Sequence, residues 1–256
     1  MIKSLFSAFL MYSRIPMPKV EWREENRRYS LGLFPIIGAV IGGLIFGWGA
    51  LCRMLGFNSP VFAAVAVLIP IAVTGGIHLD GFCDFTDARC SFADKQKRLE
   101  IMSDPHIGSF AAIYACLYLM IQGALWTQVD DIRLMGTAAL CFVMSRALSG
   151  ISAVTFRAAK SEGTLQSFVK PSHKGVNIGL GIFFFAAAAA GGAVLSPLSG
   201  AAAAVTALIV FAYYRHAAYS NLGGTTGDLC GWFLQLCEIW TLAAAVSAER
   251  VSVMIR

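Results

Sequence analysis

Long apolar stretches separated by short polar ones run through almost all of this 256-residue chain. A helix rises about 1.5 Å per residue, so ~20 apolar residues cross the roughly 30 Å hydrocarbon core of a bilayer. Hydrophobic side chains make up 57% of the chain and charged ones 14%, which is outside the usual range of soluble domains. We therefore predict an all-α, polytopic membrane bundle of about seven transmembrane helices. They are expected at residues 31–52, 60–76, 107–127, 134–155, 176–195, 199–214 and 227–248.

The chain contains no polar, low-complexity linker. We therefore predict a single integral membrane domain over residues 1–256, with residues 1–30 as an interfacial and cytoplasmic segment and the lipid bilayer as a partner. Within that segment, apolar side chains recur at helical spacing from Ile2 to Leu10, and Ser4 lies on the other side. This pattern favours an amphipathic helix that either lies at the membrane surface or packs beneath the bundle.

Lysines and arginines are unevenly distributed between the polar segments. If the N-terminus is cytoplasmic, the segments on its side, which include residues 1–30, 77–106 and 156–175, hold most of them, as the positive-inside rule requires. The sequence thus predicts a cytoplasmic N-terminus and places the polar motifs on the cytoplasmic side. This bias accounts for the formal net charge of +5, so we expect no nucleic-acid partner.

The stretch GGIHLDGFCDFTDAR places three aspartates directly after an apolar span. If the second span continues as a helix past Gly76, then Asp80, Asp84 and Asp87 share one face, which Asp94 and Arg98 would extend. Neighbouring carboxylates repel one another, so they either stay partly protonated or bind a cation. An all-oxygen donor set suits Mg²⁺, and Mn²⁺ would also fit. The alternative is a solvated acidic helix end that helps to set the topology.

Two residues beside this cluster could act as a general base. His78 lies two positions before Asp80, although a single histidine is more often structural. Asp104 precedes the third span, with Pro105 able to start that helix, so its alternative role is an ordinary N-cap. Both interpretations of each residue remain open.

A second polar motif, NLGGTTGDLCGWFLQLCEIW, covers residues 221–240. Its glycines, Gly223, Gly224 and Gly227, let a backbone approach a ligand closely, and the last span should begin near Thr226. The free N–H groups at such a helix start favour phosphate binding. Asp228 would then add a fourth carboxylate to the cluster. The alternative is an ordinary helix cap with an acidic residue that complements the helix dipole.

Two arginines could contact an anionic substrate. Arg146 lies inside the fourth span, where it must pair with a partner, and either Glu238 or a substrate phosphate would serve. Arg98 could attract an anion, although a cation in a cytoplasmic loop also satisfies the positive-inside rule.

Together these motifs resemble the cobalamin synthase family, the adenosylcobinamide-GDP ribazoletransferases. The first motif resembles the family pattern H-x-D-G-x-x-D-x-x-D, and the segments RLEIMSDPHIGSFA and GGTTGDLCGWFLQLCE are similar to the family's second and third motifs. The N-terminal segment FSAFLMYSRIPMP also fits, with Arg14 in the expected place. The resemblance spans most of the chain in consistent order.

The resemblance implies a membrane-bound, magnesium-dependent transferase of the bacterial cytoplasmic (inner) membrane. A hydroxyl of α-ribazole, or of its 5′-phosphate, would attack the cobinamide-side phosphate of adenosylcobinamide-GDP and release GMP, one of the last steps of adenosylcobalamin biosynthesis. Metal ligands would be Asp80, Asp84, Asp87 and Asp228, and the base His78 or Asp104. The substrate-binding residues would be Arg14, Arg98, Arg146, Gly223, Gly224 and Gly227.

Two other functions fit some of these residues. A CDP-alcohol phosphotransferase would also use clustered aspartates and a metal, but the final part of its signature is missing after Arg89. A cation-coupled transporter would place its acids near the middle of the membrane, whereas here they lie at one boundary. The sequence leaves the oligomeric state open.

Overall fold

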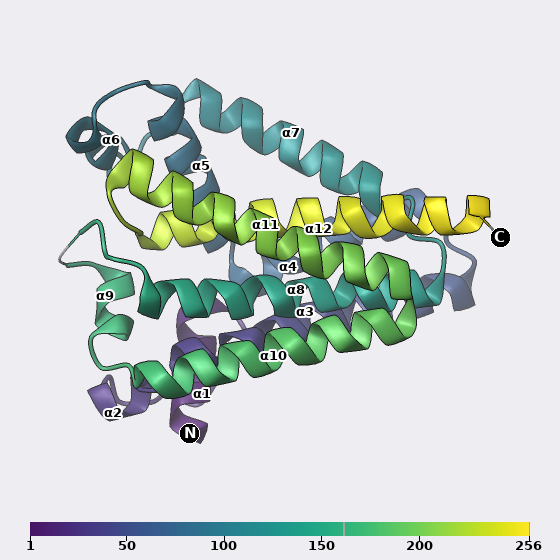
Figure 1. Cartoon of the computed structure of the whole chain (residues 1–256), viewed down its shortest axis with the longest axis horizontal. Coiled ribbons are helices and arrows are strands. Elements are labelled where there is room, and N and C mark those ends of the chain that lie inside the picture. The colour runs from purple at the N-terminus through teal and green to yellow at the C-terminus, as the bar shows by residue number, and fades with distance from the viewer. Residues whose placement is uncertain (161, 256) are drawn as a thin grey trace.

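The computed structural model describes residues 1–160 and 162–255, and all regular elements within them are helices (Figure 1). Ala158 and Thr225 form an isolated bridge. The helices are α1 (Ile2–Tyr12), α2 (Glu24–Arg27), α3 (Ser30–Leu55), α4 (Ser59–Thr74), α5 (Ile77–Cys90), α6 (Lys95–Ile101), α7 (Ser109–Trp126), α8 (Ile132–Thr155), α9 (Thr164–Val169), α10 (Lys174–Leu195), α11 (Pro197–Leu222) and α12 (Gly227–Ile255).

Within the described ranges, six helices are long and apolar enough to cross a membrane: α3, α7, α8, α10, α11 and α12. A seventh crossing is formed if α4 and α5 count as one broken span. The predicted all-α bundle of about seven spans is thus confirmed. The sixth span is longer than expected and continues to Leu222. In its added part, the guanidinium of Arg215 lies over the rings of Phe156 and Tyr219, 5.8 Å from each ring centre.

The expectation that the second span continues straight past Gly76 is wrong. α4 ends at Thr74, and α5 leaves it at an angle of 93°. Gly75 and Gly76 have φ angles of +66° and +83°, in the left-handed region that other residues rarely adopt. These two glycines therefore turn the chain and start a separate helix that carries the aspartates.

α8 forms the centre of the bundle and is almost entirely buried, whereas α10 exposes most of its surface. α3 approaches α8 closely through glycines: the position of a Cβ on Gly38 or Gly42 is blocked by the carbonyl oxygens of Phe142 and Ala139. In membranes, such close approach replaces the hydrophobic effect as a source of helix association.

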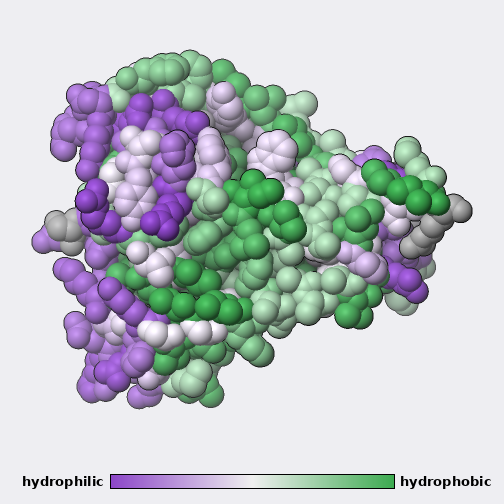
Figure 2. Space-filling view, viewed as in Figure 1, coloured by the Kyte–Doolittle hydropathy of each residue, from purple (hydrophilic) through white to green (hydrophobic). Residues whose placement is uncertain are grey.

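Polar side chains gather at one end of the molecule. The short helices α2, α6 and α9 lie at the left in Figure 1, and the same end is hydrophilic in Figure 2, while the middle of the visible face is apolar. The C-terminal end of α12 lies at the opposite end (Figure 1). The aspartate helix α5 also lies toward the polar end.

The N-terminal helix α1 forms as predicted and packs against the bundle. Ser4 and Ser7 are buried, and the hydroxyl of Ser30 in α3 donates a hydrogen bond to the Ser4 carbonyl oxygen at 2.9 Å. Ile2 and Leu10 are exposed. The side of α1 that faces the bundle thus carries Ser4 and Ser7 together with Ala8 and Phe9, while Ile2 and Leu10 face outward, where a bilayer surface would cover them.

Two neighbouring glycines of α3 allow a test of this packing. Gly42→Ala should destabilise the protein by about 1–3 kcal/mol, because the added methyl collides with the backbone of α8. Gly43 has no atom within 4 Å of its Cβ position, so Gly43→Ala should be neutral or stabilise by up to about 1 kcal/mol through helix propensity. Thermal unfolding in detergent measures both, and equal effects would contradict this packing.

Candidate active site

The site is built where α5 packs against the start of α12. A Cβ on Gly81 would lie 2.7 Å from the Asp228 Cα atom, and one on Gly231 would lie 2.9 Å from the carbonyl oxygen of His78. One glycine from each helix thus lets the two backbones touch. This contact brings Asp228 beside the aspartates of α5, although more than 140 residues separate them in sequence.

α5 contains Asp80, Asp84 and Asp87 in one unbroken helix, so the three share a face as predicted. Asp80 is exposed, and the other two are partly buried, as is Asp228 in the first turn of α12. The carboxylate of Asp87 lies against the backbone at Gly108, just before α7. Four carboxylates therefore line one region between α5, α7 and α12.

The donor chemistry of this region fits a hard divalent cation, since every donor is a carboxylate oxygen. In the described part of the chain, no three His, Cys, Asp or Glu side chains converge tightly enough to enclose an ion by themselves. Mg²⁺ commonly binds one or two protein carboxylates and completes its shell with water and substrate phosphates. A site completed by substrate fits this arrangement better than a closed protein cage.

The expected extension of this face to Asp94 and Arg98 is wrong. α5 ends at Cys90, and Phe92 adopts a positive φ of 53°. Asp94 instead caps α6, accepting a hydrogen bond from the Lys97 amide at 2.9 Å. The Arg98 guanidinium donates to the Asn221 side-chain oxygen at 2.6 Å and so ties α6 to the end of α11.

The start of α12 forms as the GGTTGD motif predicts. The hydroxyl of Thr226 accepts a hydrogen bond from the Leu229 amide at 3.1 Å and caps the helix. Gly223 ends α11 in the left-handed region, and Gly224 packs against the backbone after α8, so both have structural roles. Gly227 is exposed, with no atom of the described residues within 4 Å of its Cβ position, so that these residues leave the helix N-terminus accessible.

The loop before α12 is held by contacts that the sequence did not indicate. Thr225 exchanges backbone hydrogen bonds with Arg157 and Ala159, at 2.8 and 2.9 Å. Its hydroxyl also lies 2.5 Å from that of the buried Tyr214. The Arg157 guanidinium donates two hydrogen bonds to the Gly223 carbonyl oxygen, at 2.9 and 2.6 Å. This bridge fixes the direction in which α12 begins.

Three cavities border Asp80 or Asp228, and one of them borders both. An open cavity of 710 Å³ is lined by Arg14, Gly76 and Asp80 among others. A second, of 260 Å³, extends from Asp80 and Asp228 between α1, α3, α8 and α12. A third, of 230 Å³, lies at the start of α12 and is lined by Asp228, Gly227 and Lys160. The carboxylates therefore stand where several ligand spaces adjoin.

Arg14 lies across the break between α4 and α5. Its backbone amide donates to the Val73 carbonyl oxygen at 2.7 Å, and its side chain lies against Gly75. The side chain is exposed in the same open cavity as Asp80. The N-terminal segment thus places the positively charged Arg14 side chain at the edge of the carboxylate region.

The structure places the two candidate bases differently. His78 is buried, lines the 260 Å³ cavity together with Asp80, and has a ring Nδ1 with no hydrogen-bond partner among the described residues. Asp104 is exposed and accepts hydrogen bonds from the amide of His106 at 2.9 Å and from its ring at 2.7 Å. These hydrogen bonds lower the pKa of Asp104. The expectation that Asp104 caps the third span is wrong, because α7 begins at Ser109 with Gly108 as its N-cap.

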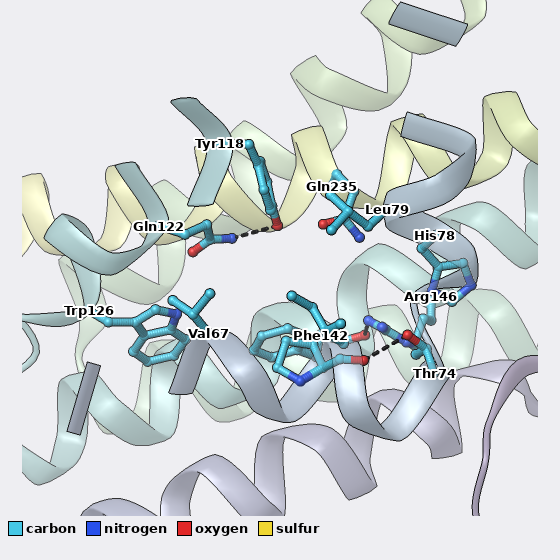
Figure 3. Close-up of a pocket in the computed structure, with 13 residues that line it drawn as sticks. Val67, Thr74, His78, Leu79, Tyr118, Gln122, Trp126, Phe142, Arg146 and Gln235 are labelled. Carbon is cyan, nitrogen blue, oxygen red and sulfur yellow. Dashed lines mark hydrogen bonds between the residues drawn. The ribbon is translucent and has the colours of Figure 1, made fainter. Parts of the chain in front are cut away.

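Arg146 pairs with Glu238 inside the bundle. Its Nη1 donates to the Glu238 carboxylate at 2.7 Å and to the Phe142 carbonyl oxygen at 3.2 Å. Figure 3 shows Arg146 and His78 beside a small cavity of 20 Å³, about the space of one water molecule, with Gln122 across it. Of the two partners expected for Arg146, the structure shows Glu238.

Comparison with known proteins decides the family. Residues 4–246 match the family model described as cobalamin-5-phosphate synthase. The chain belongs to this family. It is 40% identical over 98% of its length, and 95% of the relative's, to an adenosylcobinamide-GDP ribazoletransferase of Lachnoclostridium phytofermentans. It is 32% identical over 97% of its length, and 98% of the relative's, to one of Pelodictyon phaeoclathratiforme. No solved structure matches the chain.

The family membership predicted from the three motifs is thus confirmed. In this cobalamin-5-phosphate synthase family member, sequence reasoning missed Lys160, which lines the cavity at the start of α12 and donates to the Ser103 hydroxyl at 3.0 Å. It also missed Arg157 and Tyr214. The sequence shows a cluster of basic residues between the fourth and fifth spans. It does not show the bridge between Ala158 and Thr225 that brings this cluster to the start of α12.

The buried pair of this family member can be tested by a double-mutant cycle. Glu238→Met alone should destabilise the protein by about 3–5 kcal/mol, because it leaves a buried arginine charge without a partner. Arg146→Met combined with Glu238→Met should cost much less, since no charge remains buried. Thermal unfolding in detergent gives the coupling, and additive losses from the two single variants would contradict a stabilising pair.

Proposed function

We propose that this protein is an adenosylcobinamide-GDP ribazoletransferase, as its relatives are named. The observation that carries the proposal is that the 260 Å³ cavity shares Asp80 with the open cavity and Asp228 with the cavity at the start of α12, because a transferase must bring a donor and an acceptor together. A ribose hydroxyl of α-ribazole, or of its 5′-phosphate, attacks the cobinamide-side phosphorus. The bond to the second phosphate breaks, and GMP leaves. The product is adenosylcobalamin or its phosphate.

Asp80, Asp84, Asp87 and Asp228 would hold one or two Mg²⁺ ions, for which Mn²⁺ could substitute. The cation supplies charge neutralisation on the transferring phosphate and on the departing GMP. The four carboxylates, on one face of α5 and at the start of α12, would hold the cation beside the phosphates. This assignment makes the enzyme a magnesium-dependent phosphotransferase.

Other residues of the chain bind the phosphates directly. The exposed N–H groups at Gly227 and the Lys160 ammonium line one cavity, and both favour an anion. Arg14 offers a second cation from the open cavity. Four other predicted residues act indirectly in this proposal. The contacts of Gly223, Gly224 and Arg98 shape the loop before α12, and Arg146 stabilises the bundle.

The proton of the attacking hydroxyl passes to His78 in this proposal. His78 lines the 260 Å³ cavity with Asp80 and has an unpartnered ring nitrogen. Asp104 is the weaker candidate, because it lines none of the three cavities and is already engaged by two hydrogen bonds from His106.

Incubation of the purified protein with adenosylcobinamide-GDP, α-ribazole and Mg²⁺ tests the overall reaction. GMP should appear in equal amount to the cobalamin product, and it should not appear when the ribazole is left out. A folded sample that releases no GMP would refute the proposed activity.

The metal role can be tested at a single carboxylate. Asp84→Asn should reduce kcat/KM by about 10²-fold or more, since one ligand of the charge-stabilising group becomes neutral. Asp94→Asn is the matched control, because Asp94 caps α6 and lies off the aspartate face. Activity is measured across a Mg²⁺ titration, with unfolding temperature as the check on folding. Near-normal turnover of Asp84→Asn would remove Asp84 from the metal site.

The proposed location is the bacterial inner membrane, with the N-terminus and the carboxylates on the cytoplasmic side, as the lysine and arginine distribution requires. The polar end that holds α2, α6 and α9 would then face the cytoplasm (Figure 2). A phosphatase that is active only outside the cytoplasm should be active when fused to the C-terminus and inactive when fused after Lys174. The reverse pattern would invert the orientation.

A further inference from the structure

The 260 Å³ cavity has mainly apolar walls, although it opens onto two carboxylates of the site. α1, α3, α8, α9 and α12 all contribute to it. Its apolar lining includes Tyr12, Leu31, Phe34, Ala153, Leu165 and Leu234. Such a space, with a few polar groups set among apolar walls, is typical of a small-molecule site.

The size of the cavity separates the two substrates. Ligand pockets usually measure about 300–1,000 Å³ for drug-sized molecules, so 260 Å³ suits one small ring system with a sugar. A corrin macrocycle with an attached guanosine diphosphate is far larger. The open cavity of 710 Å³, which shares Asp80 with the smaller one, has more room for part of such a donor.

The chemistry of the walls also discriminates between the bases of the two substrates. Guanine carries several donors and acceptors around its edge, and each would need a partner when buried. Among the described residues, the polar side-chain groups of the cavity beyond the two carboxylates and His78 are the hydroxyls of Tyr12, Ser149 and Thr164 and the thiol of Cys230. A benzimidazole with two methyl groups, the base of α-ribazole, has almost no such edge and gains from apolar contact.

Aromatic side chains stand beside the polar part of this space. The rings of Tyr12 and Phe34 lie 4.6 Å apart between centroids, and the ring of His78 lies 6.5 Å from Tyr12 in a stacked orientation. Tyr12 comes from α1, so the N-terminal helix contributes directly to the cavity. A flat aromatic base can pack against such rings while its ribose extends toward Asp80 and Asp228.

We propose that this cavity binds the base of the acceptor nucleoside, an apolar two-ring aromatic, and selects it by size. The inference rests on the proposed ribazoletransferase activity, for which it names the acceptor subsite. The donor then approaches from the open cavity at Arg14, and the two substrates meet at Asp80. Ala153 and Leu165 set the size of the acceptor space, and neither belongs to the carboxylate group.

Ala153→Leu narrows the cavity and tests this subsite. The KM for the dimethylbenzimidazole riboside should rise about tenfold or more, whereas that for the unmethylated benzimidazole riboside should change much less. The KM for adenosylcobinamide-GDP should stay unchanged. Ala187→Leu on the exposed face of α10 is the matched control and should alter none of these three KM values.

Leu165→Ala widens the same cavity from the short, half-exposed helix α9, which lowers the risk of unfolding. The ratio of kcat/KM for a bulkier naphthimidazole riboside to kcat/KM for the dimethylbenzimidazole riboside should be about tenfold higher in this variant than in the wild type. The proposed subsite would be overturned if both folded variants kept the acceptor preference of the wild type, or if the KM for the acceptor and the KM for adenosylcobinamide-GDP rose equally. Absence of GMP release by the wild type would instead refute the proposed function.

Discussion

The contact between the backbones of α5 and α12 is the constraint on which the site depends. Gly81 and Gly231 let the two helices touch at Asp228 and His78, since a methyl group at either position would meet backbone atoms within 3 Å. The contact in turn requires the turn at Gly75 and Gly76, without which α5 would continue along the axis of α4. Two pairs of glycines therefore place the carboxylates.

A buried ion pair lies inside the bundle. Arg146 on α8 and Glu238 on α12 join the most buried helix to the helix that carries Asp228. Burying two charges is costly unless they are paired, so this ion pair allows one relative position of α8 and α12 and excludes others. It thereby supports the site from within the membrane, some distance from the carboxylates that the substrates would meet.

Much of the bundle could be predicted from hydropathy, because each long apolar stretch has to cross the bilayer as a helix. The shared face of Asp80, Asp84 and Asp87 followed from helical spacing alone. The 93° bend did not, since the sequence shows two glycines but not the direction of the turn. The cap considered as one alternative for Asp104 depended on a helix start at Pro105, whereas α7 begins four residues later. Lys160 could not be assigned without the bridge at Thr225.

This arrangement also explains why an integral membrane protein would perform chemistry on polar substrates. The carboxylates lie toward the hydrophilic end, where the cavities at Arg14 and Lys160 allow charged groups to approach from water (Figure 2). The 260 Å³ cavity runs from Asp80 and Asp228 in between the apolar walls of the helix bundle. A transferase that joins a large anionic donor to an acceptor with an apolar base needs both surroundings at one point. The boundary between the polar end and the apolar bundle provides them.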